Sequence, residues 1–221
     1  LPVHLVTKET FADAGLDDAT RAWAAANGFT GQEGRLLVVP GASGAIAGAL
    51  FGVAANQDGF APLATGALAR GLPDGDWHFA TSPASPDLAA LGVLLGSYAF
   101  TRYRKADSRS VRFAVPAGVD VEATHRRGEA AFLVRDLINT PTSDMGPDAL
   151  EAACRSLANA HGANVSVVMG GDLLKQNFQM IHAVGRASAQ VPRLIDMTWG
   201  SESAPKVTLV GKGVCFDTGG L

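Results

Sequence analysis

The sequence predicts an α/β protein with two domains, and three observations support this class. Strand-type and helix-type patterns alternate along the chain, as is typical of α/β domains. With 221 residues, the chain can form one large domain or two modest ones. A break containing proline and glycine at residues 116–118 separates the two halves. We therefore expect a first α/β domain at residues 1–118, a connecting helix at 119–140 and an unfinished second α/β domain at 141–221.

The first half alternates short strands with helices. Apolar runs bounded by turn residues predict four strands: residues 3–6, 36–40, 77–80 and 110–115. Helical spacing predicts two helices: residues 17–27 and 85–103. Asp17 or Asp18 is the expected N-cap of the first helix, and Gly28 is its expected stop. Pro86 lies in the first turn of the second helix, where the missing N–H of proline is tolerated.

The second half follows the same alternation after a long helix. Four helices are predicted: residues 119–138, 146–161, 172–176 and 180–184. Three strands are predicted: residues 165–169, 192–199 and 207–210. Pro147 and Asp148 support the start of the second of these helices, because proline favours the first helical position and an acid favours the first turn.

A glycine-rich stretch at residues 41–52 allows two interpretations. It follows a predicted strand, so it could hold a phosphate group, but it has neither the Gly-x-Gly-x-x-Gly spacing nor a following Gly-Lys-Ser/Thr. Gly44, Gly48 and Gly52 recur every four residues, which favours one face of a helix packed tightly against a neighbour. We expect the packed helix.

Composition and charge exclude several classes of protein. The net charge of −3 argues against a partner such as nucleic acid that is bound by a basic surface. Two cysteines do not make a disulfide framework, so a reducing, cytoplasmic location is expected. The apolar runs are too short to span a bilayer, so no membrane association is expected.

The last twelve residues, VGKGVCFDTGGL, are the most informative part of the chain. They follow a predicted apolar strand and place Lys212 and Asp217 among four glycines. A neutral lysine can ligate a metal, and a carboxylate can bridge two metals. Removing the lysine proton near neutral pH is unfavourable, and a divalent cation can compensate for it.

The spacing of Lys212 and Asp217 requires a bend if both are to bind one metal. On a regular strand residues five apart face opposite ways, and their Cα atoms lie about 16 Å apart. Gly211 and Gly213 permit the bend. A simple ion pair between Lys212 and Asp217 explains the same residues, and chemistry alone supports both interpretations equally.

Three segments resemble the leucyl aminopeptidase family of dinuclear metallopeptidases. Residues 207–221, VTLVGKGVCFDTGGL, look like the metal-binding signature of this family. Residues 134–148, VRDLINTPTSDMGPD, resemble it less specifically, as do MIHAVGRAS from residue 180 and PRLID from residue 192. The first 120 residues match only in general layout.

The resemblance implies a small N-terminal α/β domain, a connecting helix and a larger catalytic α/β domain with a mixed sheet. It implies a metal-dependent aminopeptidase with two divalent ions, zinc or manganese, a bicarbonate nearby, peptide substrates and a homo-hexamer. Lys212 matches the lysine that ligates one metal, and Asp217 matches the aspartate that bridges both. The catalytic lysine and the other ligands would follow Leu221, so no catalytic residue is expected within these residues, and the chain alone should be inactive.

Other chemistries remain as alternatives. Phe216-Asp217-Thr218-Gly219 resembles the Asp-Thr-Gly loop of aspartic peptidases, in which two aspartates share a proton. A non-enzymatic module that binds ADP-ribose or another nucleotide through residues 41–52 is the second alternative. Cys215 has no histidine nearby in sequence to activate it, so we expect it to be a small buried filler rather than a nucleophile.

Overall fold

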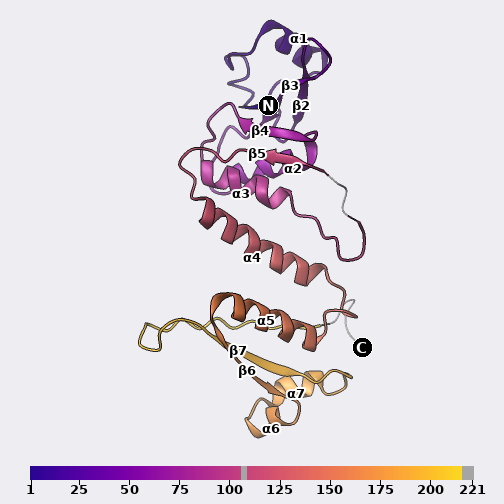
Figure 1. Ribbon diagram of the computed structural model, residues 1–221, viewed down its shortest axis with the longest axis vertical. Helices are drawn as coiled ribbons and strands as arrows, with labels where there is room; N and C mark the ends of the chain where they lie inside the picture. The colour runs from indigo at the N-terminus through magenta and orange to yellow at the C-terminus, as the bar shows by residue number, and fades with distance from the viewer. Residues whose placement is uncertain (106–108, 216–221) are drawn as a thin grey trace. The chain divides into compact units, whose positions relative to one another are not determined.

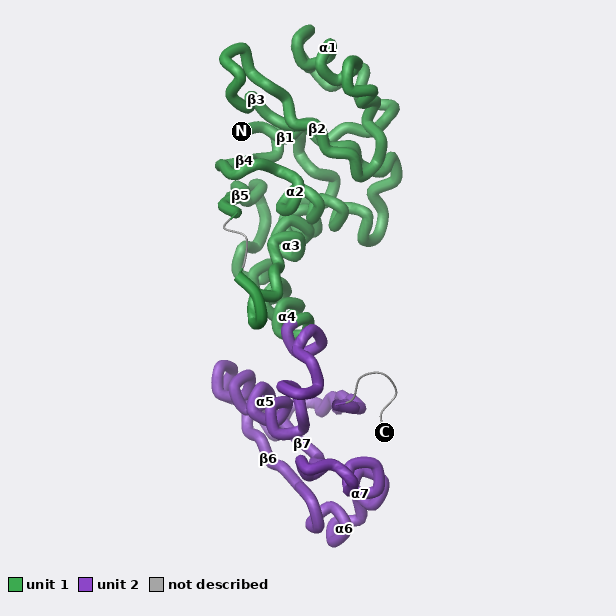
Figure 2. Tube along the Cα trace, turned by 90° about the vertical axis from the view of Figure 1, so that its right-hand side faces the viewer, with its two compact units in different colours: residues 1–135 green, residues 136–221 purple. Residues whose placement is uncertain are grey.

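The computed structural model describes residues 1–105 and 109–215, and its elements are drawn in Figure 1. The chain forms two compact units, Leu1–Arg135 and Asp136–Leu221, which Figure 2 shows in different colours. Both units combine helices with strands, and the strands pair in parallel and antiparallel fashion. The predicted α/β class with a mixed sheet is therefore confirmed. Within the described residues, no helix is long and apolar enough to cross a bilayer.

The first unit contains a mixed sheet of five strands. The strands are β1 (Pro2–Val6), β2 (Leu36–Pro40), β3 (Ile46–Gly52), β4 (Gly75–Phe79) and β5 (Val111–Phe113). Their order across the sheet is β2-β3-β1-β4-β5. β1 runs parallel to both β3 and β4, β4 runs parallel to β5, and β2 is antiparallel to β3. The four strands predicted in this half are confirmed, and β3 is an additional one.

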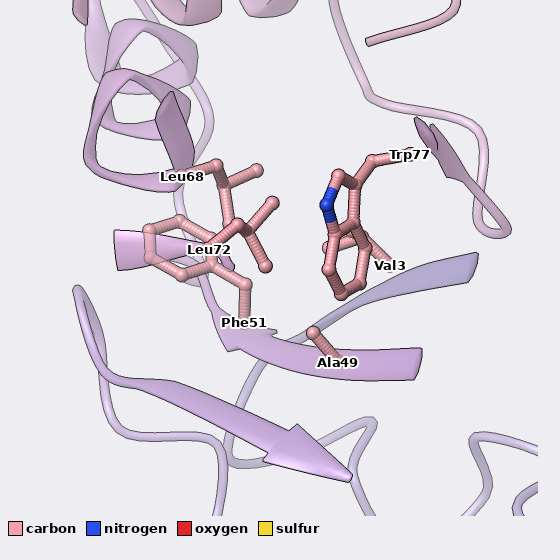
Figure 3. Packing of buried hydrophobic residues seen from close by; sticks show 6 residues of the cluster. All are labelled: Val3, Ala49, Phe51, Leu68, Leu72 and Trp77. Carbon is pink, nitrogen blue, oxygen red and sulfur yellow. The ribbon is translucent and has the colours of Figure 1, made fainter. Parts of the chain in front are cut away.

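Helices cover both faces of this sheet because successive side chains of a strand point to opposite faces. The helical elements of the first unit are α1 (Asp18–Ala26), the 3₁₀ helix η1 (Ala61–Thr65), α2 (Gly66–Gly71) and α3 (Pro86–Gly96), and the next helix, α4 (Val121–Asn139), contains the division between the two units. One buried cluster joins strands β1, β3 and β4 to α2; Figure 3 shows its members: Val3, Ala49, Phe51, Leu68, Leu72 and Trp77. A second cluster packs strand residues against α1; its members are Val6, Ala24, Phe29, Val39 and Leu50.

The helix expected around Gly44, Gly48 and Gly52 is wrong, because this stretch forms a turn followed by strand β3. The expected close packing is nevertheless present. A β-carbon placed on Gly48 would lie 2.9 Å from the carbonyl oxygen of Pro2, and one on Gly52 would lie 1.9 Å from that of Gln32. Gly48 and Gly52 therefore let the backbone of β3 approach other backbone segments closely. A spacing of four residues fits this role as well as it fits a packed helix, so the spacing alone does not separate the two.

The helix predicted for residues 85–103 is shorter than expected. α3 begins at Pro86, as predicted, but ends at Gly96. Ser97 caps this end, since its hydroxyl donates a hydrogen bond to the carbonyl of Leu94 at 2.7 Å. A β-carbon on Gly96 would lie 2.0 Å from the carbonyl oxygen of Gly66, so this glycine also allows α3 to approach the start of α2 closely. η1 and α2 were not predicted, because each spans less than two helical turns.

The second unit packs three helices around a two-stranded antiparallel sheet. Its elements are α5 (Pro147–His161), β6 (Asn164–Met169), α6 (Asp172–Lys175), α7 (Gln179–Gly185) and β7 (Arg193–Thr198). Pro147 occupies the start of α5, and Gly162 ends this helix with the left-handed φ of 67°. All the helices and the first two strands predicted in this half are confirmed, and α4 and α5 match their predicted starts and ends within two residues.

The third predicted strand, residues 207–210, is wrong for this structure. No described strand pairs with these residues, and they form no regular element. The side chains are strongly exposed: 83% for Val207, 92% for Leu209 and 93% for Val210. A strand requires a partner for its backbone groups, and the described chain provides none at this place.

Candidate metal-binding segment

Lys212 lies in an irregular segment after the exposed residues 207–210. Its side chain is exposed, and no ion pair joins it to the described residues. A β-carbon placed on the preceding Gly211 would meet no described heavy atom within 4 Å, so the backbone is uncrowded at that residue. An exposed amine without an ion-pair partner among the described residues can serve as one nitrogen donor to a metal.

Asp217, the second predicted ligand, lies outside the described residues. The bend that would bring it to the same metal as Lys212 therefore stays a prediction. Among the residues that the structure describes, no group of three or more histidine, cysteine, aspartate or glutamate side chains could hold a metal ion. Of the two predicted metal ligands, only Lys212 lies among the described residues.

The residues after Lys212 lie against the first turns of α5. A β-carbon placed on Gly213 would be 3.3 Å from Cδ2 of Leu150. Cys215 is half-buried, and this burial raises the pKa of its thiol, although the nearby Arg193 acts in the opposite direction. Because the thiolate is the reactive form of cysteine, the structure supports a packing role for Cys215 rather than a nucleophilic one.

An ion cluster joins α5 to β7. Arg193, at the start of β7, donates from one terminal nitrogen to Glu151 and from the other to Asp148. Glu151 also accepts a hydrogen bond from Nε of Arg155 at 2.8 Å. Hydrogen bonds from Arg155 and then from Arg193 hold the pKa of Glu151 below its usual value. Glu151 is therefore a carboxylate shared between two guanidinium groups.

Sequence reasoning did not identify this cluster. Asp148 was recognised only as an acid in the first turn of a helix, and Arg193 only as part of a resembling segment. The two residues lie 45 positions apart, and Glu151 lies 42 positions from Arg193. No periodic pattern connects residues at such separations, so only the packing of α5 on β7 could find the contact.

The glycine-rich stretch does not form a phosphate-binding loop. Gly48 lines a small pocket together with His4, Asp17 and Thr20, and no lysine or arginine is among the described residues that line it. A phosphate would therefore meet the carboxylate of Asp17 without a compensating cation. The stretch itself continues into strand β3 from Ile46, where a phosphate site would need a helix N-terminus.

Comparison with protein families decides between these interpretations. The model of the M17 aminopeptidase N-terminal domain matches residues 1–116, and the model of the cytosol aminopeptidase catalytic domain matches residues 132–221. The chain belongs to the cytosol aminopeptidase family. Both predicted metal ligands lie within the catalytic-domain match, and the aspartic-peptidase and nucleotide-binding alternatives are not favoured.

Related proteins agree with membership of the cytosol aminopeptidase family. A probable cytosol aminopeptidase of Leifsonia xyli is 35% identical over 225 residues, covering 94% of this chain and 45% of the relative. The solved cytosol aminopeptidase of Coxiella burnetii is also 35% identical and superimposes with a TM-score of 0.83, covering 98% of this chain and 48% of that one. The bottromycin maturation enzyme BotP, solved in complex with Mn, is 25% identical with a TM-score of 0.71, covering 91% and 45%. The chain thus spans a little under half the length of these relatives.

Proposed function

We propose that this chain is part of a metal-dependent aminopeptidase that releases N-terminal amino acids from peptides. The observation that carries the proposal is the family match across nearly the whole chain, with the motif containing Lys212 inside the catalytic-domain match. The name of the Leifsonia relative, a probable cytosol aminopeptidase, supports the same activity. Because the chain spans under half of that relative, the activity belongs to the longer protein.

The proposed role of this chain in the reaction is to provide two metal ligands, Lys212 and Asp217. Lys212 is suited to this role because it is exposed and no carboxylate of the described residues pairs with it. Bound divalent ions would activate a water molecule and polarise the carbonyl of the scissile peptide bond. Two ions, zinc or manganese, are proposed; a manganese complex of the related BotP supports the second choice.

The remaining parts of the proposal concern partners and location. Peptides are the proposed substrates. The family resemblance suggests a homo-hexamer and a bicarbonate near the metals. It also suggests a cytoplasmic location, and the word cytosol in the names of the relatives supports this last point alone. We also propose that residues 119–140 connect an N-terminal domain, 1–118, to the catalytic domain that starts at 141. Analytical ultracentrifugation of the full gene product tests the hexamer.

The direct test uses the full gene product with an N-terminal leucine peptide and measures metal content by elemental mass spectrometry. Replacing Lys212→Met should remove one nitrogen ligand, lower kcat at least about 100-fold and reduce bound metal, because even indirect disturbance of a metal ligand costs about 10–100-fold. Lys206→Met is the matched control, since Lys206 is an exposed lysine in the same segment. Full activity and metal content in the Lys212 variant would contradict the proposal.

The pH profile and the effect of a chelator separate this proposal from an aspartic peptidase. A metallo-aminopeptidase should be active near neutral pH and lose activity with a chelator, and divalent ions should restore it. An acid optimum unaffected by chelator would indicate instead that Asp217 shares a proton with a second carboxyl.

A further inference from the structure

The first unit contains an apolar cavity of about 250 Å³ that is lined by both strands and helices. Five elements contribute to its walls: Ala69 of α2, Phe79 of β4, Val93 of α3, Phe113 of β5 and Val121 of α4. None of the described residues that line it is an aspartate, glutamate, lysine or arginine. Apolar cavities of about 150 Å³ can stay dry and take up benzene, so this cavity has room for a small organic molecule.

A contact between α3 and α4 holds the helical wall of the cavity in place. A β-carbon placed on Gly128 of α4 would lie 2.4 Å from Cδ2 of Leu94 in α3, so the two helices, labelled in Figure 1, touch at this glycine. The cavity opens to solvent near the start of α4, because Val115 and Val121 line it and are half-exposed. A ligand therefore has a route into the cavity from the solvent.

Three of the described lining residues have polar side chains, and two of these already have partners. The hydroxyl of Ser97 donates a hydrogen bond to the carbonyl of Leu94 at 2.7 Å, and Nδ1 of His125 lies 3.2 Å from Oε1 of Glu129. The third residue, Thr124, is only 6% exposed, and its hydroxyl has no hydrogen-bond partner among the described residues. Buried polar groups are nearly always hydrogen-bonded, because leaving one unpaired is unfavourable. The hydroxyl of Thr124 therefore needs a partner that the described chain does not supply.

Two other threonines are buried in the described structure, and both satisfy their hydroxyls with backbone carbonyls. Thr65 donates to two carbonyls, at 2.9 and 2.8 Å. Thr140, directly after α4, donates at 2.6 Å to the carbonyl of the residue four positions earlier. Thr124 also has a carbonyl four positions earlier, on Asp120, which accepts from the backbone N–H of Thr124 but not from its hydroxyl. Thr124 thus lacks the local bond that its counterpart at the other end of the same helix makes.

A change of rotamer lets Thr124 offer its hydroxyl to a ligand in the cavity. Thr124 lines the cavity, although its hydroxyl oxygen is shielded in the rotamer of this structure. The hydroxyl and the methyl group share one carbon, and threonine uses two rotamers in helices, so a polar atom in the cavity can favour the rotamer that turns the hydroxyl toward it. A water molecule would need two or more polar partners there, and the apolar walls supply few. An organic molecule fits this cavity better than water does.

We propose that this cavity binds a compact, neutral organic molecule whose apolar ring fills the space and whose single polar group hydrogen-bonds to the hydroxyl of Thr124. The ligand is neutral because moving a charged group out of water is unfavourable without a partner, and the described lining offers no carboxylate, lysine or arginine. The proposal concerns the first unit and does not rest on the proposed peptidase function.

Phenol and toluene are matched probes of the cavity, because they share one ring and differ by a hydroxyl in place of a methyl group. Their affinities for the full gene product are measured by titration with saturation-transfer NMR, without any peptide. Thr124→Val keeps the shape of the side chain but removes the hydroxyl. It should weaken phenol about two- to tenfold, the usual net contribution of one hydrogen bond, and change toluene by less than about twofold.

Thr140→Val is the control for this comparison, because it removes a buried threonine hydroxyl that is not in the cavity lining. It should leave the affinity for both probes unchanged, and circular dichroism confirms that each variant is folded. Equal affinities for phenol in wild-type and Thr124→Val protein would overturn the proposal. So would a wild-type gene product that binds neither probe, because other residues of the longer protein would then already fill the cavity.

A second pair of variants tests whether the probes occupy this cavity. Ala90→Leu adds three carbons to a lining residue of α3 and should weaken both phenol and toluene at least about tenfold, because the added carbons take the place of the ring. Ala152→Leu, at an exposed alanine of α5, is the matched control and should change neither affinity. If Ala90→Leu does not fold, Ala114→Leu adds the same carbons at an exposed lining residue. Unchanged binding in a folded, filled variant would place the probes elsewhere and reject the site.

The melting temperatures of the two valine variants provide a test without any ligand. Thr140→Val should lower the melting temperature of the full gene product, because it removes a hydrogen bond that the fold uses. Thr124→Val should leave it unchanged or raise it, because a methyl group replaces a buried hydroxyl that has no partner. An equal decrease in both variants would show that the hydroxyl of Thr124 already has a partner within the longer protein, and would overturn the proposal.

Discussion

Two apolar segments of this chain, residues 46–52 and 207–210, differ in whether they form a strand. The first contains two glycines and was expected to be helical, yet it forms β3 between β2 and β1. The second is rich in β-branched residues and was expected to be a strand, yet it is exposed and pairs with no strand of the described residues. Local preference predicted the reverse of what is observed in both cases. The comparison shows that available partners, more than composition, decide where a strand forms.

The largest expected effect is on the free energy of unfolding, because side chains are buried in residues 46–52 and exposed in residues 207–210. Phe51→Ala removes a fully buried side chain from the first core cluster and should lower the free energy of unfolding by about 3–5 kcal/mol. Leu209→Ala should change it by less than about 0.5 kcal/mol in the 221-residue chain, because the side chain is 92% exposed. Urea unfolding of both variants checks this. A large loss for Leu209→Ala would show that residues 207–210 are packed in solution.

Replacing a glycine by alanine should change stability by a smaller amount, and the change should differ between Gly52 in β3 and Gly211, which directly follows residues 207–210. Gly52→Ala would force a methyl group to 1.9 Å from the backbone carbonyl of Gln32, so the strand must shift, at a cost of about 1–3 kcal/mol. Gly211→Ala meets no atom within 4 Å and should be nearly neutral. Thermal unfolding of the two variants in parallel tests the contrast; equal melting temperatures would contradict the close approach of β3 to residue 32.

The smallest expected effect concerns pH and the ion cluster of the second unit. The fold lowers the pKa of Glu151 from its usual value near 4.5, so the ionised carboxylate stabilises the folded state above that pH. This contribution should disappear as the pH falls through the lowered pKa. The melting temperatures of the wild-type protein and of Glu151→Gln should therefore differ at pH 7 and converge only as the pH falls through the lowered pKa of Glu151. A difference that grows on acidification would show the sign to be wrong.

Helices were predicted better than strands because their signals are local. Asp17 accepts a hydrogen bond from the backbone N–H of Thr20 at 2.7 Å, three residues on, as an N-cap should. Gly28 and Gly162 follow α1 and α5 with positive φ. These contacts join residues within one or two turns, so the order of residues suffices to predict them.

Around the candidate site too, local features were predictable from the sequence and contacts between distant residues were not. Lys212 and its flanking glycines form a contiguous motif, and the motif led to the family that the models confirm. Asp148, Glu151 and Arg193 form a site only after α5 packs on β7, which brings together residues more than 40 positions apart. The residues next to Arg193 in the sequence give no sign that carboxylates will pair with it in the fold.

The order of residues was therefore sufficient for the α/β class, for helices α1, α4 and α5, and for the metal-binding motif, because each depends on residues close along the chain. Packing was required to place β3 inside the sheet, to end α3 at Gly96, to leave residues 207–210 without a partner among the described strands and to bury Arg193 between α5 and β7. Backbone pairing and burial of charge depend on which distant groups become neighbours. Those neighbours exist only in the folded chain.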